Sequence, residues 1–317
     1  MSVWMLLRNT RTMKMQRLSL AFKMITKFVL NLEGEVKRAK IKREIKVLET
    51  LKGHSNIIEL VDYVVDPSTK TPSLVQFLSI TSFYQVLSYV EALDFRELYP
   101  ILTKEDIKIY IYQILQGLDY AHSKGIIHRD IKPGNVLINH KEKKLKIADW
   151  GLADFYTPHK SYNVRVASRY FKAPELLIGL NEYDYQLDVW SVGCMLAGMV
   201  FAREPFFKGA DNDDQLVKIA KVMGTQPIYN YCNKFGIELG SYFDENLQKQ
   251  FFINPNKPYS FKTKPWDRFV NNINEELIDV KVFDLLDKLL VIDHTDRITA
   301  SEALQHPYFS TIRYKMI

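Results

Sequence analysis

Two segments of the chain, GIIHRDIKPGNVLIN and KLKIADWGL, carry polar residues whose types and spacing suit chemistry on phosphate groups. Asp130 follows a His-Arg pair, Asn135 lies five residues beyond it, and Asp149 precedes an aromatic residue and a glycine. Phosphoryl transfer needs a carboxylate to accept the hydroxyl proton, oxygen ligands for magnesium ions and a cation beside the transferring group. Asp130 fits the first requirement, Asn135 and Asp149 fit the second, and Lys132 fits the third.

A long helix is predicted directly before these segments. Thr103 and Asp106 form a capping signature, apolar residues then recur at helical spacing, and Gly125 ends the pattern. Residues 188–201 are apolar on every face, which predicts a helix buried at the centre of a domain. Further helices are predicted at 214–223, 280–290 and 300–305. The chain after about residue 90 is therefore predicted to be mainly helical.

The first part of the chain has a different pattern. Short apolar segments at 28–32 and 57–64 predict strands, and a helix is predicted between them at 36–51. Residues 71–90 are rich in β-branched and aromatic residues and lack charges, which predicts two strands, or one strand and an insertion. A small strand-containing part is therefore expected to join a larger helical part near residues 89–93.

The composition is that of a soluble globular protein. Of 317 residues, 47% are hydrophobic and 25% are charged, which allows one two-lobed unit or two domains. Lys and Arg outnumber Asp and Glu by six (43 against 37), which indicates anionic partners or a merely basic surface. Cys194 and Cys232 are too few for a disulfide framework or a structural zinc site, so a reducing intracellular compartment is expected. No apolar run could span a bilayer, and no membrane association is expected.

The polar segments fit a larger ordered pattern. H-R-D-x-x-x-x-N, D-x-G and A-P-E occur in this order, and DVWS and DRITA follow. The pattern resembles the protein-kinase signature, with Trp150 at the usual phenylalanine position. The segments DWGLADFYTPHKSYNVRVASRYFKAPELL and EPFF are more specific, and the chain is similar to the catalytic alpha subunit of casein kinase II from about residue 36 to residue 312.

This resemblance implies an α+β, bilobal protein kinase fold, with a small β-rich N-lobe at 1–89 and a large helical C-lobe at 90–317. It implies a serine/threonine protein kinase that uses ATP, or alternatively GTP, with Mg2+. Carried over by motif, Asp130 is the catalytic base, and Lys132 contacts the γ-phosphate. Asn135 and Asp149 hold magnesium.

Further residues take roles from the same resemblance. Glu44 is the acid of the N-lobe helix, Val90 belongs to the hinge at Ser88–Tyr89–Val90, and Leu137 lies under the adenine. Glu175 and Arg297 pair to brace the activation segment, and Asp188 caps the backbone of the catalytic loop. For Asp188 and Arg297 a purely structural role is the alternative, and the two readings coincide.

The resemblance also implies acidic protein substrates, which basic side chains read. One group is Lys37, Arg38 and Lys40, together with Lys42 and Arg43, on the predicted helix. The second group is Arg165, Arg169 and Lys172, after the activation loop. A solvated basic helix face is the alternative for the first group. Nucleic acid is a weaker candidate, because no aromatic platform or nucleic-acid module accompanies the basic residues.

The N-terminal part departs from the family. Asn31 lies where kinases have the lysine that holds the α- and β-phosphates, no glycine precedes Gly34, and residues 76–85 look like an insertion. The chain is then either a non-catalytic pseudokinase that acts as a scaffold for acidic proteins, or an imperfect reading of an active kinase gene. The second is the favoured interpretation.

Partner and localisation follow from the resemblance alone. It implies a tetramer with the regulatory beta subunit of casein kinase II, docked on the N-lobe sheet, and a location in nucleus and cytoplasm. Residues 1–32 contain basic side chains but no acid, which is typical of a mitochondrial presequence and gives the alternative location.

Overall fold

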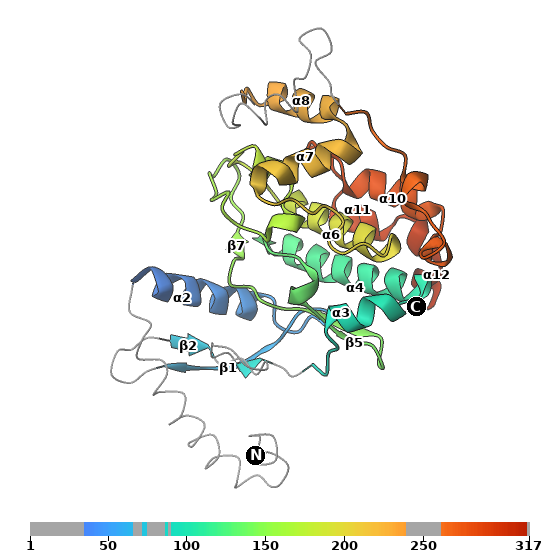
Figure 1. Cartoon of the computed structure of the whole chain (residues 1–317). Helices are drawn as coiled ribbons and strands as arrows, with labels where there is room; N and C mark the ends of the chain where they lie inside the picture. The colour runs from blue at the N-terminus through green and yellow to red at the C-terminus, as the bar shows by residue number, and fades with distance from the viewer. Residues whose placement is uncertain (1–34, 66–71, 75–85, 88–89, 239–260, 316–317) are drawn as a thin grey trace. The chain divides into compact units, whose positions relative to one another are not determined.

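The computed structural model in Figure 1 describes most of the helical part of the chain and less of the first part. The residues that it describes are 35–65, 72–74, 86–87, 90–238 and 261–315. The predicted strand at 28–32, Asn31 and the proposed insertion at 76–85 lie outside these residues. The chain divides into two compact units, which are described separately below: one within Met1–Lys46 and Leu60–Tyr89, and one formed by Val47–Glu59 and Val90–Ile317.

The first unit contains most of one helix and a three-stranded sheet. Helix α2 spans Glu35–Thr50, which confirms the helix predicted at 36–51. The sheet is antiparallel with the order β2-β1-β3. Its strands are β1 (Leu60–Val65), β2 (Pro72–Leu74) and β3 (Val86–Leu87).

The second unit is built around α4, a helix of 20 residues at Lys104–Ser123. Its N-terminus carries the predicted capping box, since the Thr103 hydroxyl accepts from the Asp106 amide and the Asp106 carboxylate accepts from the Thr103 amide, both at 3.2 Å. Its apolar stripe is fully buried and includes Ile107, Ile111 and Ile114. It packs against α6 (Gln186–Val200), α11 (Ala300–Leu304) and β6 (Lys144–Ile147).

The second central helix, α6, spans Gln186–Val200 and lies beside α4 in Figure 1. All residues from Leu187 to Val200 are buried, which confirms the buried helix predicted at 188–201. Gly193 permits close packing against the end of α10 (Lys281–Leu289), because a Cβ there would lie 2.8 Å from Leu290, the residue after this helix. The two helices thus form the core that supports the loops described below.

The remaining helices of this unit complete the helical half. Helices α7 and α10 confirm the predictions at 214–223 and 280–290, and α11 confirms the one at 300–305. The α-helices are α3 (Phe95–Leu98), α5 (Pro174–Leu177), α7 (Asn212–Met223), α8 (Thr225–Lys234), α10 (Lys281–Leu289), α11 (Ala300–Leu304) and α12 (Ser310–Lys315). None of the helices within the described ranges is both long enough and apolar enough to cross a membrane.

Two short strand pairs bring distant loops together. Strand β4 (Ile126–Ile127) pairs with β7 (Asp154–Phe155), and β5 (Val136–Asn139) pairs with β6 (Lys144–Ile147). The loop after β4 and the loop after β6 therefore lie side by side. These are the segments that carry HRD and DWG.

The prediction of a strand at 57–64 is wrong for residues 57–59. Strand β1 begins only at Leu60, whereas Ile57 forms an isolated parallel bridge with Ile147 of β6. The amide of Ile147 donates to the carbonyl of Asn56 at 2.8 Å, and the amide of Ile58 donates to the carbonyl of Ile147 at 2.9 Å. A partner about ninety residues away thus determines the pairing, and local apolar content does not reveal it.

A buried carboxyl group after α6 gives a pH-dependent stability. Glu204 packs against Gly198, and its Oε2 is buried without a hydrogen-bond partner in the described structure. Burial raises the pKa of Glu204 from its ordinary 4.5 to about 7. The ionisable neighbours Tyr99 and Cys194 cannot carry a positive charge, and burial raises their pKa values as well, so both stay neutral beside Glu204.

The folded protein therefore keeps a proton on Glu204 between about pH 4.5 and pH 7, where the unfolded chain loses it. Stability is fully present below this window and falls as the pH rises through it, by on the order of 3 kcal/mol. Glu204→Gln is expected to leave Tm unchanged at pH 4, below this window, and to raise it at pH 8. Thermal unfolding across this range tests the effect, with exposed Glu276→Gln as the control. Parallel Tm curves for Glu204→Gln and the parent would contradict it.

Candidate active site

The loop that carries HRD is clamped by a carboxylate from α6. Asp188 Oδ2 accepts from the His128 amide at 2.8 Å, and its Oδ1 accepts from the Arg129 amide at 2.8 Å. His122 Nε2 lies 3.0 Å from the same carboxylate. Burial alone would raise the pKa of Asp188, but the bond from His122 and the positive ends of these donors outweigh it and lower the pKa. Asp188 thus stays ionised and fixes the loop backbone through these two amides.

His128 joins the HRD loop to the DWG segment. Its Nε2 lies 3.1 Å from the Ala148 carbonyl, its Nδ1 accepts from the Asp130 amide at 3.2 Å, and its ring contacts Trp150 edge-on at 4.5 Å. Burial lowers the pKa of His128, which agrees with a neutral ring that donates through one nitrogen and accepts through the other. The Ala148 amide also donates to the Asn135 carbonyl at 2.8 Å. Asp149 therefore directly follows the residue that is hydrogen-bonded to Asn135.

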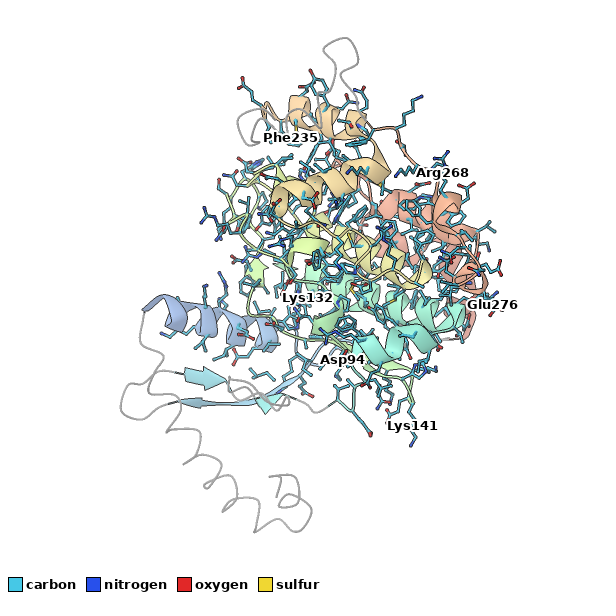
Figure 2. The ribbon with its side chains drawn as sticks, in the orientation of Figure 1. Asp94, Lys132, Lys141, Phe235, Arg268 and Glu276 are labelled. Atoms are coloured by element: carbon cyan, nitrogen blue, oxygen red, sulfur yellow. The ribbon has the colours of Figure 1, made fainter. Side chains whose placement is uncertain are left out.

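The carboxylate of Asp130 lies at the centre of a hydrogen-bonded group. Its Oδ2 accepts from Lys132 Nζ at 2.6 Å and from Asn135 Nδ2 at 3.1 Å. Its Oδ1 accepts from both the amide and the hydroxyl of Ser168 at 2.9 Å. Lys132 Nζ also donates to the Ser168 hydroxyl at 2.9 Å. Figure 2 shows Lys132 toward one end of α4, far from Glu276 at the other end of the unit.

Ser168 belongs to this group, although no sequence motif predicted it. It lies in RVASRYFK, directly after Ala167, which has the unusual positive φ of 60°. This turn aims both the amide and the hydroxyl of Ser168 at Asp130. A hydroxyl residue inside a basic segment next to A-P-E was the available signal, but only the fold shows its contact.

Asn135 and Asp149 present oxygen atoms of the kind that magnesium prefers. The Asn135 amide nitrogen donates to the Asp130 carbonyl at 2.8 Å, which leaves the amide oxygen as its ligating atom. Asp149 is exposed and has a positive φ of 58°. Within the described ranges, no three His, Cys, Asp or Glu side chains are grouped to hold a metal by themselves. Magnesium at kinase sites takes one or two carboxylates plus phosphate oxygens, so these two residues fit it.

The three basic residues predicted after the activation loop differ in their surroundings. Arg165 and Arg169 are exposed, and Arg169 donates to the Ala210 carbonyl. Lys172 is buried, and its ammonium donates to the Val166 carbonyl at 2.7 Å. Burial lowers the pKa of Lys172, while nearby Asp130 raises it. In this structure Lys172 braces the segment that carries Ser168.

Glu175 and Arg297 form a bidentate ion pair in the core. Two guanidinium nitrogens donate to the two carboxylate oxygens at 2.9 and 3.0 Å, and both side chains are 0% exposed. Arg297 also stacks over Trp190 at 5.1 Å. The pair connects the end of the activation segment with a loop late in the chain.

For the other predicted site residues, the structure gives the element on which each lies and, for most, its exposure. Glu44 is half-buried and Lys40 exposed on α2, and Lys37 and Arg38 belong to the same helix. Val90 is half-buried, and Leu137 is half-buried on β5 opposite Lys146.

The comparison with known protein families agrees with this geometry. The family model of the protein kinase domain matches residues 10–309, which is nearly the whole chain and includes Asp130, Lys132, Asn135 and Asp149. The match and the mixture of helices with small sheets confirm the predicted α+β kinase fold. It also implies the use of ATP and, as is usual for such domains, Mg2+. The chain belongs to the protein kinase family.

Proposed function

We propose that this kinase is a serine/threonine kinase of the casein kinase II alpha type, which phosphorylates hydroxyl groups in acidic sequence contexts. The supporting observation is the position of Ser168. It contacts Asp130 directly, and the exposed Arg165 and Arg169 lie three residues before it and one residue after it. The groups that perform the chemistry and the groups that attract acids are thus parts of one segment. The proposal that serine and threonine are the acceptors rests on the resemblance of the catalytic segments to those of casein kinase II alpha.

The residues around Asp130 have separate tasks in the transfer. Asp130 accepts the proton of the substrate hydroxyl as the oxygen attacks phosphorus. Lys132 and Asn135 donate to one of its oxygens and Ser168 donates to the other, which fixes the direction in which the carboxylate accepts the proton. The Lys132 ammonium can turn from Asp130 toward the negative charge of the transferring group.

Nucleotide and metal follow from the family and from the oxygen ligands. ATP supplies the phosphoryl group, and GTP is proposed as an alternative donor. The Asn135 amide oxygen and the Asp149 carboxylate would hold Mg2+, which shields the phosphate charges when it is bound. Leu137 and Val90 are proposed to contact the base of the nucleotide. Glu44 on α2 is proposed to take part in nucleotide binding.

Acidic residues next to the substrate hydroxyl would meet Arg165 and Arg169. Three residues span at most about 10 Å of extended chain, so Arg165 can reach side chains close to the reacting hydroxyl. Lys172 contributes positive charge near Asp130 while it braces the segment. Lys37, Arg38 and Lys40 on α2 are proposed to bind acidic residues of the same substrates.

A non-catalytic role is the second candidate, and Asn31 is the observation that favours it. The amide of Asn31 cannot supply the positive charge that kinases place on the α- and β-phosphates. The chain would then bind acidic proteins through the same arginines without transferring phosphate. As partners we propose acidic substrate proteins and the regulatory beta subunit of casein kinase II, and as location nucleus and cytoplasm.

The test is phosphate transfer from magnesium-ATP to a serine peptide followed by acidic residues. Transfer by the purified chain supports the kinase, and binding of the peptide without transfer supports the scaffold. Binding neither nucleotide nor peptide would overturn both candidates.

The proposed role of Arg165 and Arg169 can be tested in the same assay. Arg165→Ala with Arg169→Ala is expected to raise KM for the acidic peptide about five- to thirtyfold with little change in kcat, because exposed ion pairs contribute up to about 1 kcal/mol each. Lys262→Ala with Arg268→Ala removes the same charge elsewhere and is the control. Equal KM values for the double variant and the parent would contradict acid recognition by these arginines.

A further inference from the structure

Two aliphatic side chains of the second unit extend almost fully into solvent. Ile273 is 78% exposed and Val280 is 77% exposed, which makes them the most exposed large hydrophobic residues that the structure describes. Single exposed aliphatic residues are common on protein surfaces, whereas neighbouring ones on a fixed backbone indicate an interaction surface. The contacts of the adjacent residues show that Ile273 and Val280 belong to the second case.

The turn that carries Ile273 is fixed by the buried side chain of Asn274. This side chain is 0% exposed, and its Nδ2 donates to the carbonyls of Phe201 and Phe269 at 3.1 and 3.0 Å. Its Oδ1 accepts from the Asn271 amide at 2.9 Å. A rotation of the turn that buried Ile273 would break these buried hydrogen bonds. The turn therefore keeps Ile273 in solvent.

Val280 is held in a similar way at the start of α10. The carboxylate of Asp279, directly before it, accepts from the buried Lys108 Nζ of α4 at 2.6 Å and from the Lys281 amide at 3.1 Å. The amide of Phe283 donates to the Val280 carbonyl at 3.3 Å and begins the helical turn. The ion pair and the first turn of α10 together fix the backbone of Val280.

The two fixed turns pack on one residue, Phe201. Its carbonyl accepts from Asn274, and its ring contacts the ring of Phe283 at 6.4 Å between centroids. The chain between the turns coils through a 3-10 helix of three residues. Such a helix rises about 2 Å per residue, and an extended residue spans at most about 3.6 Å, so the Cα atoms of Ile273 and Val280 lie within about 20 Å of each other. One short segment of a partner can therefore contact both.

The charges around this pair are negative. Between the two aliphatic residues the chain carries three acids and no base: Glu275, Glu276 and Asp279. Asp279 is balanced by Lys108, but Glu275 and Glu276 are exposed and form no ion pair within the part of the chain that the structure describes. The exposed Lys281 beside them cannot balance both glutamates. This surface therefore repels acidic proteins and anionic membranes and attracts a basic segment.

We propose that the surface formed by residues 273–280 is a docking site for a segment of a partner protein that carries aliphatic side chains next to lysine or arginine. The aliphatic side chains would cover Ile273 and Val280, and the basic ones would pair with the two glutamates. Figure 2 shows Glu276 at the periphery of the unit, away from Lys132 of the catalytic loop. The proposal concerns binding alone and does not depend on phosphate transfer.

Three labelled peptides of equal length test this chemistry by fluorescence anisotropy with the full chain. The first is composed of leucine and lysine, the second of serine and lysine, and the third of leucine and glutamine. The leucine–lysine peptide is expected to bind at least about tenfold more tightly than the other two, because it alone supplies both kinds of contact. No binding of this peptide, or equal binding of the serine–lysine peptide, would overturn the proposal.

A variant without the two aliphatic side chains locates the binding. Ile273→Ser with Val280→Ser is expected to weaken binding of the leucine–lysine peptide at least about tenfold at a parental Tm, because both side chains are exposed. Leu93→Ser with Ile101→Ser removes two exposed aliphatic side chains elsewhere and is the matched control, with a Kd close to that of the parent. Equal Kd values for the two double variants would place the peptide elsewhere and contradict the assignment.

Reversal of the two glutamate charges tests the polar part of the surface. Glu275→Lys with Glu276→Lys is expected to weaken binding about tenfold or more at low salt and less at high salt, because salt screens exposed charges. The control is Glu97→Lys with Glu142→Lys, which reverses two exposed charges elsewhere, Glu142 being in an exposed pair with Lys144. If both double variants bind the peptide equally, these glutamates do not attract the basic segment.

Self-association is the competing use of the same surface. Size-exclusion chromatography over a wide range of concentration is expected to show a monomer, because two copies of an acidic surface repel each other. A dimer that Ile273→Ser with Val280→Ser dissociates would assign the surface to a second copy of this chain and overturn the proposal.

Discussion

Asp130→Asn is expected to lower the rate of phosphate transfer by about 10²- to 10⁴-fold, which is the contribution of a positioned general base. The carboxylate of Asp130 is the group that can accept the substrate proton, and an amide cannot do so. The variant should still fold, because the amide oxygen can accept from Lys132 and Asn135 while the amide nitrogen donates to the Ser168 hydroxyl. Only the bond from the Ser168 amide is lost.

The measurement is the single-turnover rate with magnesium-ATP and the acidic serine peptide, together with Tm. Asp94→Asn is the matched control, since Asp94 is exposed and caps α3, where asparagine caps equally well. Its rate and Tm should equal those of the parent. If Asp130→Asn keeps more than a tenth of the parental rate with a parental Tm, another group accepts the proton and the assignment of Asp130 is wrong.

The helical scaffold could be predicted because its signals are local. The Thr103–Asp106 capping box and the apolar periodicity after it lie within one segment, and both are present in α4. The segment of α6 is apolar on all faces, so it has no polar face to expose to solvent, and it is buried on every side. Asp130, Lys132 and Asn135 lie within six residues, so their mutual contacts follow from one short loop.

The remaining contacts depend on pairings between distant segments. Ile57 bridges to Ile147, and Ser168 reaches Asp130 from 38 residues away. Periodicity and composition carry no information on such distances. The burial of Lys172 is a further case, because its basic side chain suggested an exposed binding group. In each case the folded backbone, and no local preference, selects the partner.

The ion pair between Glu175 and Arg297 joins positions 122 residues apart, and its rupture is expected to have the largest effect on stability. Glu175→Gln is expected to lower the free energy of unfolding by about 3–5 kcal/mol, because it leaves a buried guanidinium without its counterion. Burial tends to lower the pKa of Arg297, but the adjacent carboxylate raises it. Arg297 therefore stays charged, and the protein cannot escape the penalty by deprotonation.

Removal of the arginine should cost more than removal of the glutamate. Arg297 also donates to the carbonyls of Gln186, Val291 and Ile292, at 2.7, 2.9 and 3.2 Å. Arg297→Met leaves these buried acceptors unpaired in addition to a buried carboxylate, and each unpaired group costs about 1–3 kcal/mol. The order of stability is therefore expected to be parent, Glu175→Gln, Arg297→Met.

The double variant Glu175→Leu with Arg297→Met separates the charge from the packing. It leaves no uncompensated charge, so it is expected to be less destabilised than the sum of Glu175→Leu and Arg297→Met measured singly. Urea unfolding followed by tryptophan fluorescence reports on this unit, because Trp150, Trp190 and Trp266 are buried in it. Glu142→Gln, in the exposed pair with Lys144, should change stability by less than about 1 kcal/mol. Additive losses in the double variant would mean that the pair acts through its backbone bonds alone, and that the charges of Glu175 and Arg297 are not coupled.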